Sequence, residues 1–223
     1  MENPTGTPLT LELLASFSIA GITPFAADDA PGRLVRHRFR STWSMEGRLD
    51  SQPVEDLQLE RSWAGWGVRC ERFGSIGSMP VRNFFPFAAV EDTAANVTWA
   101  ARLDVPGSWQ MEVYRRDDGL SLSGGLADRE LGHWMKAIPP GGVFESPRAF
   151  LTCTEGGIDE ACDALLDAVT AAASPSPRRE QGLPVIVNEW ATTWGAPTHD
   201  NLAAIAARIR GLGARYLVID AGW

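Results

Sequence analysis

The chain has 223 residues, of which 44% are hydrophobic, which is enough for one large domain or two small ones with an ordinary buried core. Its 28 acidic residues exceed its 20 Lys and Arg and give a formal net charge of −8, which argues against nucleic acid or an anionic membrane as a partner. A neutral substrate fits this charge better. The three cysteines and three histidines have no zinc-ligand spacing. The apolar N-terminal stretch is too short to span a bilayer, so we expect a cytoplasmic protein.

Alternation of apolar and polar residues predicts antiparallel strands from about residue 33 to residue 153. In VRHRFR, the apolar-side residues Val35, His37 and Phe39 alternate with three arginines, and VEDLQLE (54–60) and WQMEV (109–113) show the same period. Turn residues separate the strands at 74–77, 117–119, 124–125 and 139–142. Several strands at regular spacing predict an antiparallel β-sandwich over residues 1–157.

The hydrophobic period changes near residue 158 from that of a strand to that of a helix. The residues that recur at helical spacing are Ile158, Cys162, Leu165, Leu166 and Val169. The following stretch, ASPSPRREQG at 173–182, combines proline, serine and charge without an apolar face, as linkers do. We therefore expect a helix and a Pro-rich linker over residues 158–183.

A third pattern covers residues 184–223. LPVIVNEW contains a continuous apolar strand, Pro197-Thr198 opens a helix, and RYLVIDAGW contains a second apolar strand. Continuous apolar strands are typical of parallel sheets that are covered on both faces. This segment is therefore predicted to form one βαβ unit of a parallel sheet.

The residues that could carry chemistry follow these two apolar strands. The first strand ends at Asn188, Glu189 and Trp190, and the second ends at Asp220 and Trp223. The carboxyl ends of parallel strands meet at one edge of a sheet, where loops vary over a rigid scaffold. Carboxylates and amides bind sugar hydroxyls, and indoles pack on the apolar face of a sugar ring, so these residues predict a carbohydrate site.

Other interpretations of these residue types stay open. A strand-end aspartate often caps a helix or a loop, and Trp190 and Trp194 could pack at the edge of a core. Five more tryptophans lie in the β region and are expected in the sandwich core: Trp63, Trp66, Trp99, Trp109 and Trp134. His37 is expected to be packed or solvated, not catalytic.

Both parts of the chain resemble a known family. NEWATTWG, a helix and then LVIDAGW resemble the opening of the catalytic barrel of family 36 glycoside hydrolases, the bacterial α-galactosidases and their relatives. WGVRCERFGSIGSMPVRNFFPF and GHWMKAIPPGGVFESPRAFLTCTEGGIDE are similar to parts of that family's N-terminal β-sandwich domain. The resemblance implies a multidomain fold, in which an antiparallel, supersandwich-like β-sandwich is followed by the first βαβ unit of a (β/α)8 TIM barrel.

The resemblance also implies an activity, which is the retaining hydrolysis of terminal α-linked galactose without a metal or an organic cofactor. It implies that Trp190 forms a wall of the galactose subsite and that Asp220 holds galactose hydroxyls. Asn188 and Trp223 complete the predicted substrate-binding set, for a galactoside-type carbohydrate. The full-length enzyme could be a homo-oligomer.

The sequence departs from the family pattern in two respects. Where the family usually has a second aspartate after Asp220, this chain has Ala221, whose side chain cannot accept a hydroxyl hydrogen bond; such a loss costs about 1.5–3 kcal/mol of binding. In the family the catalytic carboxylates come from later barrel strands, and this chain contains two of about eight strands. We therefore expect a truncated chain that contains no catalytic residue, is inactive alone and has an incomplete sandwich domain.

Two alternatives to this function remain. The chain could be a non-catalytic carbohydrate-binding protein whose tryptophan-rich sandwich holds the glycan. It could also be a glycosidase of the same class with a different sugar preference, because Ala221 leaves room for a bulkier substituent.

Overall fold

The structure, a computed structural model, describes residues 1–220 except residues 23, 27–29, 60–69 and 117–118. The chain divides into two compact units, Met1–Ala172 and Ala173–Trp223. All the antiparallel strand pairs that the structure describes belong to the first unit, and the one parallel pair belongs to the second.

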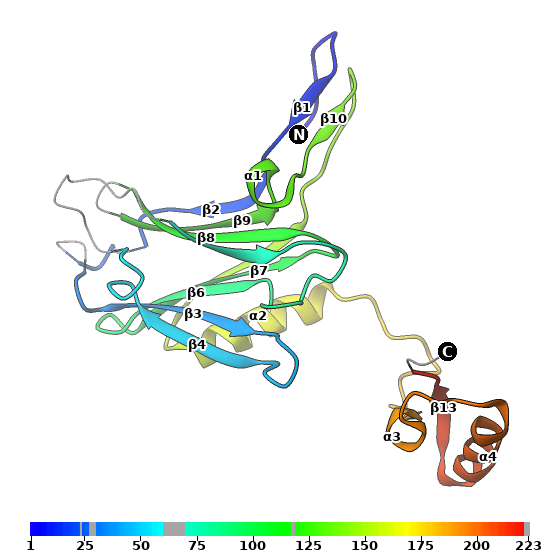
Figure 1. The fold of residues 1–223 in the computed structure, drawn as a ribbon. Helices are drawn as coiled ribbons and strands as arrows, with labels where there is room; N and C mark the ends of the chain where they lie inside the picture. The colour runs from blue at the N-terminus through cyan, green and yellow to red at the C-terminus, as the bar shows by residue number, and fades with distance from the viewer. Residues whose placement is uncertain (23, 27–29, 60–69, 117–118, 221–223) are drawn as a thin grey trace. The chain divides into compact units, whose positions relative to one another are not determined.

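Two antiparallel sheets form the body of the first unit (Figure 1). The five-stranded sheet has the order β11 (Arg148–Glu155), β7 (Val97–Asp104), β6 (Phe87–Asp92), β3 (Leu34–Arg40) and β4 (Arg48–Pro53). The four-stranded sheet has the order β2 (Ala15–Ile19), β9 (Gly119–Leu126), β8 (Trp109–Arg116) and β5 (Cys70–Ser75). The predicted antiparallel β-sandwich is confirmed.

The main core lies between these two sheets. Trp109, Met111 and Val113 of β8 are fully buried and pack in one cluster with residues of β3, β6 and β7. The alternation in WQMEV therefore marks the inner face of the sandwich, as predicted. Trp99 is 9% exposed and belongs to the same cluster, whereas Trp63 and Trp66 lie outside the described residues. Trp134 is not in this core and instead packs on the ring of Phe144, with 5.6 Å between the ring centroids.

A second core lies on the other face of the five-stranded sheet. The helix α2 (Ile158–Ala172) lies beside this sheet (Figure 1). It buries Ala161 and Leu165 against Phe87, Ala89 and Ala100 of β6 and β7. The predicted helix is confirmed, and it packs on the sandwich. Because α2 packs on one face and the four-stranded sheet on the other, the central strands β6 and β7 bury side chains on both faces.

A two-stranded ribbon completes the first unit and stands away from the two sheets (Figure 1). It pairs β1 (Leu9–Leu11) with β10 (Lys136–Ile138). The short helix α1 (Arg129–Gly132) precedes β10 and is capped by Asp128, whose carboxylate accepts from the backbone N–H of Leu131 at 2.7 Å.

Two predictions about local structure were wrong. Residues 54–58 form a turn instead of a strand, because the Leu59 backbone N–H turns back to the Val54 carbonyl at 2.8 Å. Gly124 and Gly125 lie inside β9 instead of in a turn. A Cβ atom on Gly125 would be 2.7 Å from the Leu14 carbonyl oxygen, so glycine is needed there for the close approach of the neighbouring strand.

The second unit is a βαβ unit. Its elements are β12 (Val185–Asn188), α3 (Trp190–Thr193), α4 (His199–Ile209), the 3-10 turn η1 (Arg210–Leu212) and β13 (Ala214–Val218). β12 and β13 pair in parallel, as predicted. Thr198 opens α4 by accepting from the Asn201 backbone N–H at 3.3 Å, and the Asn201 side chain accepts from the Thr198 N–H at 2.8 Å.

The strand pair of the second unit is not covered as the sequence predicted. The adjacent residues Val185 and Ile186, whose side chains alternate between the faces of a strand, are 54% and 59% exposed, so the described residues leave both of these apolar side chains largely uncovered. No helix in the described part of the chain is long and apolar enough to cross a membrane.

Candidate functional site

Asn188 and Asp220 meet at the carboxyl ends of β12 and β13. The parallel register places Asn188 opposite Val218, and Asp220 follows two residues later. The Asn188 amide nitrogen donates to Asp220 Oδ2 at 2.7 Å, and its Oδ1 accepts from the Trp190 backbone N–H at 2.9 Å. These two bonds fix the orientation of the amide. The structure therefore brings together two of the predicted site residues from segments far apart in the sequence.

Glu189, the residue after Asn188, is fully buried, with 0% exposure. Its Oε1 accepts from the backbone N–H of Asp220 at 2.9 Å, and its Oε2 accepts from the hydroxyl of Thr193. A buried carboxylate requires such donors. Glu189 thus ties the segment after β13 to the first helix after β12, and it holds the backbone of Asp220 in place.

Trp190 begins α3 and leaves 41% of its surface exposed. Gly195, at φ 83°, lies against its ring, since a Cβ atom there would be 3.2 Å from Cζ3 of the indole. The ring is therefore supported on one side and partly open. Trp194 ends the same helix in the left-handed region, at φ 51°, and is 76% exposed.

The arrangement offers a carboxylate, an amide and a supported indole at one end of a parallel strand pair. These groups suit hydrogen bonds to hydroxyls and packing on an apolar ring face. The remaining predicted site residue, Trp223, lies outside the described residues, as does Ala221, so their places stay predictions. Among the residues that the structure describes, no group of three His, Cys, Asp or Glu side chains could hold a metal ion.

The two acids at this site do not form an accessible carboxylate pair. Asp220 is partly exposed, whereas Glu189 is enclosed and both of its oxygens accept hydrogen bonds. A nucleophile or a general acid must reach the substrate. Glu189 is therefore a residue that positions others, which the sequence did not reveal because its burial depends on partners that lie up to 31 residues away.

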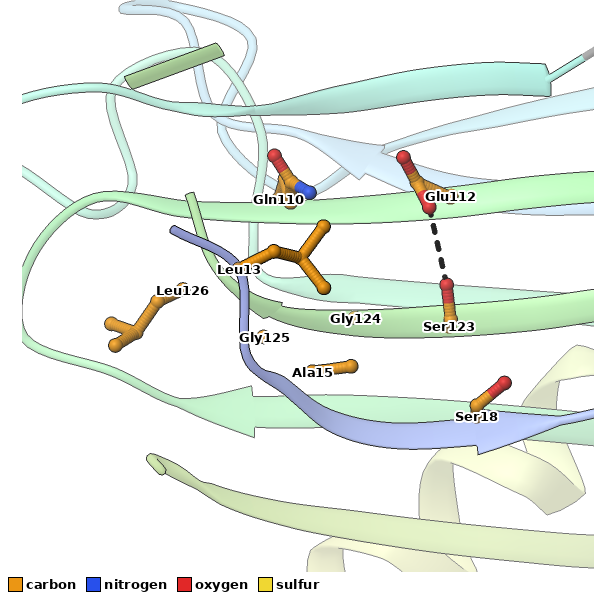
Figure 2. Close-up of a pocket in the computed structure, with 9 residues that line it drawn as sticks. All are labelled: Leu13, Ala15, Ser18, Gln110, Glu112, Ser123, Gly124, Gly125 and Leu126. Carbon is orange, nitrogen blue, oxygen red and sulfur yellow. Dashed lines mark hydrogen bonds between the residues drawn. The ribbon is translucent and has the colours of Figure 1, made fainter. Parts of the chain in front are cut away.

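A separate small hollow of about 110 Å³ opens on the outer side of the four-stranded sheet (Figure 2). Leu13, Leu126, Gly124 and Gly125 are among the residues that line it (Figure 2). Its one charged group, Glu112, already accepts from Arg72 Nε at 2.6 Å and from the Ser123 hydroxyl at 3.4 Å. Small-molecule pockets usually measure about 300–1,000 Å³, so this hollow is a weaker candidate.

Comparisons with known proteins agree with the sequence resemblance. No protein-family model matches the chain. α-Galactosidase Mel36A of Lactobacillus acidophilus is 24% identical over 180 residues, which cover 78% of this chain and 24% of that protein. A probable α-galactosidase G of Emericella nidulans is 24% identical over 227 aligned positions, which cover 100% of this chain and 28% of that protein.

Solved structures share the fold of this chain. A doubly substituted variant of the GH36 α-galactosidase AgaA of Geobacillus stearothermophilus, in complex with raffinose, superposes with a TM-score of 0.75 at 17% identity, over 100% of this chain and 28% of that one. The resemblance to family 36 α-galactosidases is thereby confirmed. The chain spans about a quarter of the length of these relatives.

Proposed function

We propose that the chain is part of a family 36-like glycoside hydrolase that cleaves terminal α-linked galactose by a retaining mechanism. In this proposal the first unit is the supersandwich-like N-terminal domain, and the second is the first βαβ unit of a (β/α)8 barrel. The observation that carries the proposal is the 2.7 Å bond between Asn188 and Asp220. It lies at the carboxyl ends of parallel strands, which is where the active sites of such barrels are built.

Each site residue then has a role toward the sugar. Asp220 accepts hydrogen bonds from galactose hydroxyls, Asn188 orients that carboxylate, and Trp190 packs on the apolar face of the ring. Trp223 is proposed to line the same subsite. Ala221 removes one acceptor that the family usually has, so replacing it by aspartate is expected to change the sugar preference on a glycan array.

No catalytic residue of the glycosidase reaction is assigned to these 223 residues. Retaining glycosidases use two carboxylates about 5–5.5 Å apart, one as nucleophile and one as acid and base. Asp220 and the enclosed Glu189 do not supply such a pair. The purified chain is therefore expected not to hydrolyse an aryl α-galactoside, and turnover above the uncatalysed rate would refute this part of the proposal.

Ligand-observed NMR with galactose tests the binding role. The wild-type chain is compared with Trp190→Ala and with a matched control, Trp194→Ala, which removes the more exposed indole from the other end of the same helix. Galactose binding should be lost in the first variant and retained in the second. Equal binding by all three proteins would contradict the assignment of Trp190.

A second candidate function is glycan binding by the sandwich itself. A hollow of about 470 Å³ on the first unit is lined by aromatic, proline and charged residues, among them Phe39, Phe85, Pro86 and Arg102. Its volume falls within the range of small-molecule pockets. Trp99 and Trp109 cannot serve this function because the core encloses them. Loss of glycan binding in Phe85→Ala but not in Trp190→Ala would favour this candidate.

A further inference from the structure

A serine, a histidine and a glutamate of the first unit are joined by hydrogen bonds on the α2-covered side of the five-stranded sheet. Ser51 Oγ lies 2.8 Å from His37 Nδ1, and His37 Nε2 lies 2.9 Å from Glu91 Oε2. The three residues come from β4, β3 and β6, which are adjacent strands. His37 is the direct cross-strand partner of Ser51, so the sheet register fixes their contact.

The donors and acceptors in this chain have a defined direction. The Glu91 carboxylate only accepts, so His37 Nε2 carries the proton. Burial lowers the pKa of His37, although the hydrogen bond and the charge of Glu91 oppose this effect, and a lowered pKa favours the neutral ring. Nδ1 of a neutral ring with a proton on Nε2 is an acceptor, so the Ser51 hydroxyl donates to it. A serine in this state is poised to lose its proton to the imidazole.

Ser51 is accessible, whereas the base behind it is not. Ser51 is exposed on β4, the edge strand of its sheet, and His37 is only 5% exposed. The Val54 backbone N–H bonds to the Leu34 carbonyl at 3.1 Å, so in the alternating ladder Ser51 and His37 form a pair without backbone hydrogen bonds. The Ser51 backbone N–H therefore points away from β3 toward the open edge. In serine hydrolases the N–H of the attacking serine helps to stabilise the oxyanion.

An open hollow of about 390 Å³ has Ser51 among its lining residues and gives room for a small ligand. The other residues that line it are Arg40, Met45, Arg48, Leu49 and Asp50. The nucleophile, the base and the group that orients the base are thus in contact, and the nucleophile faces solvent-accessible space.

We propose that Ser51 is an activated nucleophile that accepts acyl groups from small activated esters, with His37 as its general base and Glu91 as the residue that positions the base. Ser51 Oγ bonds to the carbonyl carbon of the ester while His37 Nδ1 takes the hydroxyl proton. The bond between that carbon and the leaving oxygen then breaks, and the alcohol leaves with the proton from His37. The product is an acyl-serine, and no oxidation or reduction occurs.

Acetylation by p-nitrophenyl acetate, mapped by mass spectrometry of peptides, tests this proposal on the wild-type chain. The matched control is Ser18, an exposed serine on the edge strand β2 whose hydroxyl lies 3.5 Å from the hydroxyl of Tyr114. General-base assistance typically contributes at least about a hundredfold, so Ser51 should be acetylated about a hundredfold faster than Ser18. Equal rates at the two serines would overturn the proposal.

The variant Glu91→Gln gives a second test, in which Ser51 and His37 are both retained. It should slow acetylation of Ser51 more than about tenfold, because the histidine loses the carboxylate that fixes its tautomer, and it should leave Ser18 unchanged. Circular dichroism checks that the variant keeps its fold. An unchanged rate at Ser51 in a folded Glu91→Gln chain would also overturn the proposal.

Discussion

The ion pair between Arg36 and Glu71 gives the most direct prediction about the stability of the sandwich. Arg36 of β3 is fully buried, and it reaches across the core to β5, where its Nε and Nη2 donate to the two oxygens of Glu71 at 3.1 and 3.2 Å. Arg38 donates to the same carboxylate at 3.0 Å. Replacing Glu71 by alanine leaves a buried guanidinium without its main carboxylate.

Breaking such a buried pair typically costs about 3–5 kcal/mol. Arg36 keeps a carboxylate oxygen of Asp50 at 3.7 Å and the Asp50 carbonyl at 3.1 Å, so we expect the lower end of this range, about 3 kcal/mol. Urea unfolding measures the loss, with the fluorescence of the buried Trp109 as one probe of the first unit.

The control for this prediction is Glu130→Ala. The Glu130 side chain is 83% exposed and lies 3.1 Å from Arg72, and exposed pairs of this kind contribute about 0–1 kcal/mol. The two substitutions remove the same groups and differ in the burial of the partner. The reasoning fails if Glu71→Ala destabilises the first unit by no more than Glu130→Ala does.

Three further predictions concern the same unit. Gly125→Ala should destabilise it by about 1–3 kcal/mol, because the new Cβ would be 2.7 Å from main-chain atoms. Gly6→Ala, whose Cβ meets nothing within 4 Å, should be nearly neutral, and equal melting temperatures of the two variants would contradict this prediction. Leu165→Ala should lower the free energy of unfolding by about 2–5 kcal/mol, because this side chain is only 4% exposed. Leu166→Ala, at a site 60% exposed, should change it by less than about 0.5 kcal/mol. Similar urea midpoints of the two variants would refute the assignment of the buried face of α2. Burial raises the pKa of Asp50, but hydrogen bonding and charge from neighbouring arginines outweigh it and hold the pKa below its usual value. The Asp50 carboxylate therefore binds protons more tightly in the unfolded chain, so its contribution to stability is present above about pH 4 and is lost as the pH falls below that value. Asp50→Asn should reduce the loss of stability at acid pH. An identical dependence of stability on pH in the variant and the wild type would argue against this role of Asp50.

The sandwich could be predicted where one face of a strand is clearly apolar. The pattern of Trp109, Met111 and Val113 is unambiguous because the opposite face of β8 is polar. The strand around Arg36 shows why the same rule has limits. Its arginine face points into the sandwich, where a carboxylate from the other sheet satisfies the charge. Alternation shows that the strand has two different faces. It does not show where the partner carboxylate of the arginines lies, because that residue is distant in the sequence.

Glycine occurs both in turns and inside strands where another strand approaches closely, and the sequence does not distinguish these two roles. Gly124 and Gly125 are typical turn residues, and the structure places them in a strand because the neighbouring strand approaches too closely for side chains. Such a contact joins residues about 110 positions apart in the chain, so no local pattern signals it.

The candidate site was predictable in part for a topological reason. Parallel strands that are linked through a helix end at the same edge, so Asn188 and Asp220 were expected to meet, and they do. The role of Glu189 was not predictable, because an acid after an apolar strand looks the same in sequence whether it is exposed or enclosed. The contact between Ser51 and His37 depends on a strand register that the sequence did not fix.

The affinity of the chain for galactose, measured for Asp220→Asn beside Asp200→Asn, tests the proposed function most directly. Both substitutions remove one negative charge from the second unit, and Asp200 is fully exposed in the first turn of α4, away from the strand ends. Losing a charged acceptor costs about 1.5–3 kcal/mol, so Asp220→Asn should bind galactose about ten- to a hundredfold more weakly than the wild type, while Asp200→Asn should bind it equally well. Equal affinity of Asp220→Asn and the wild-type chain would contradict the account.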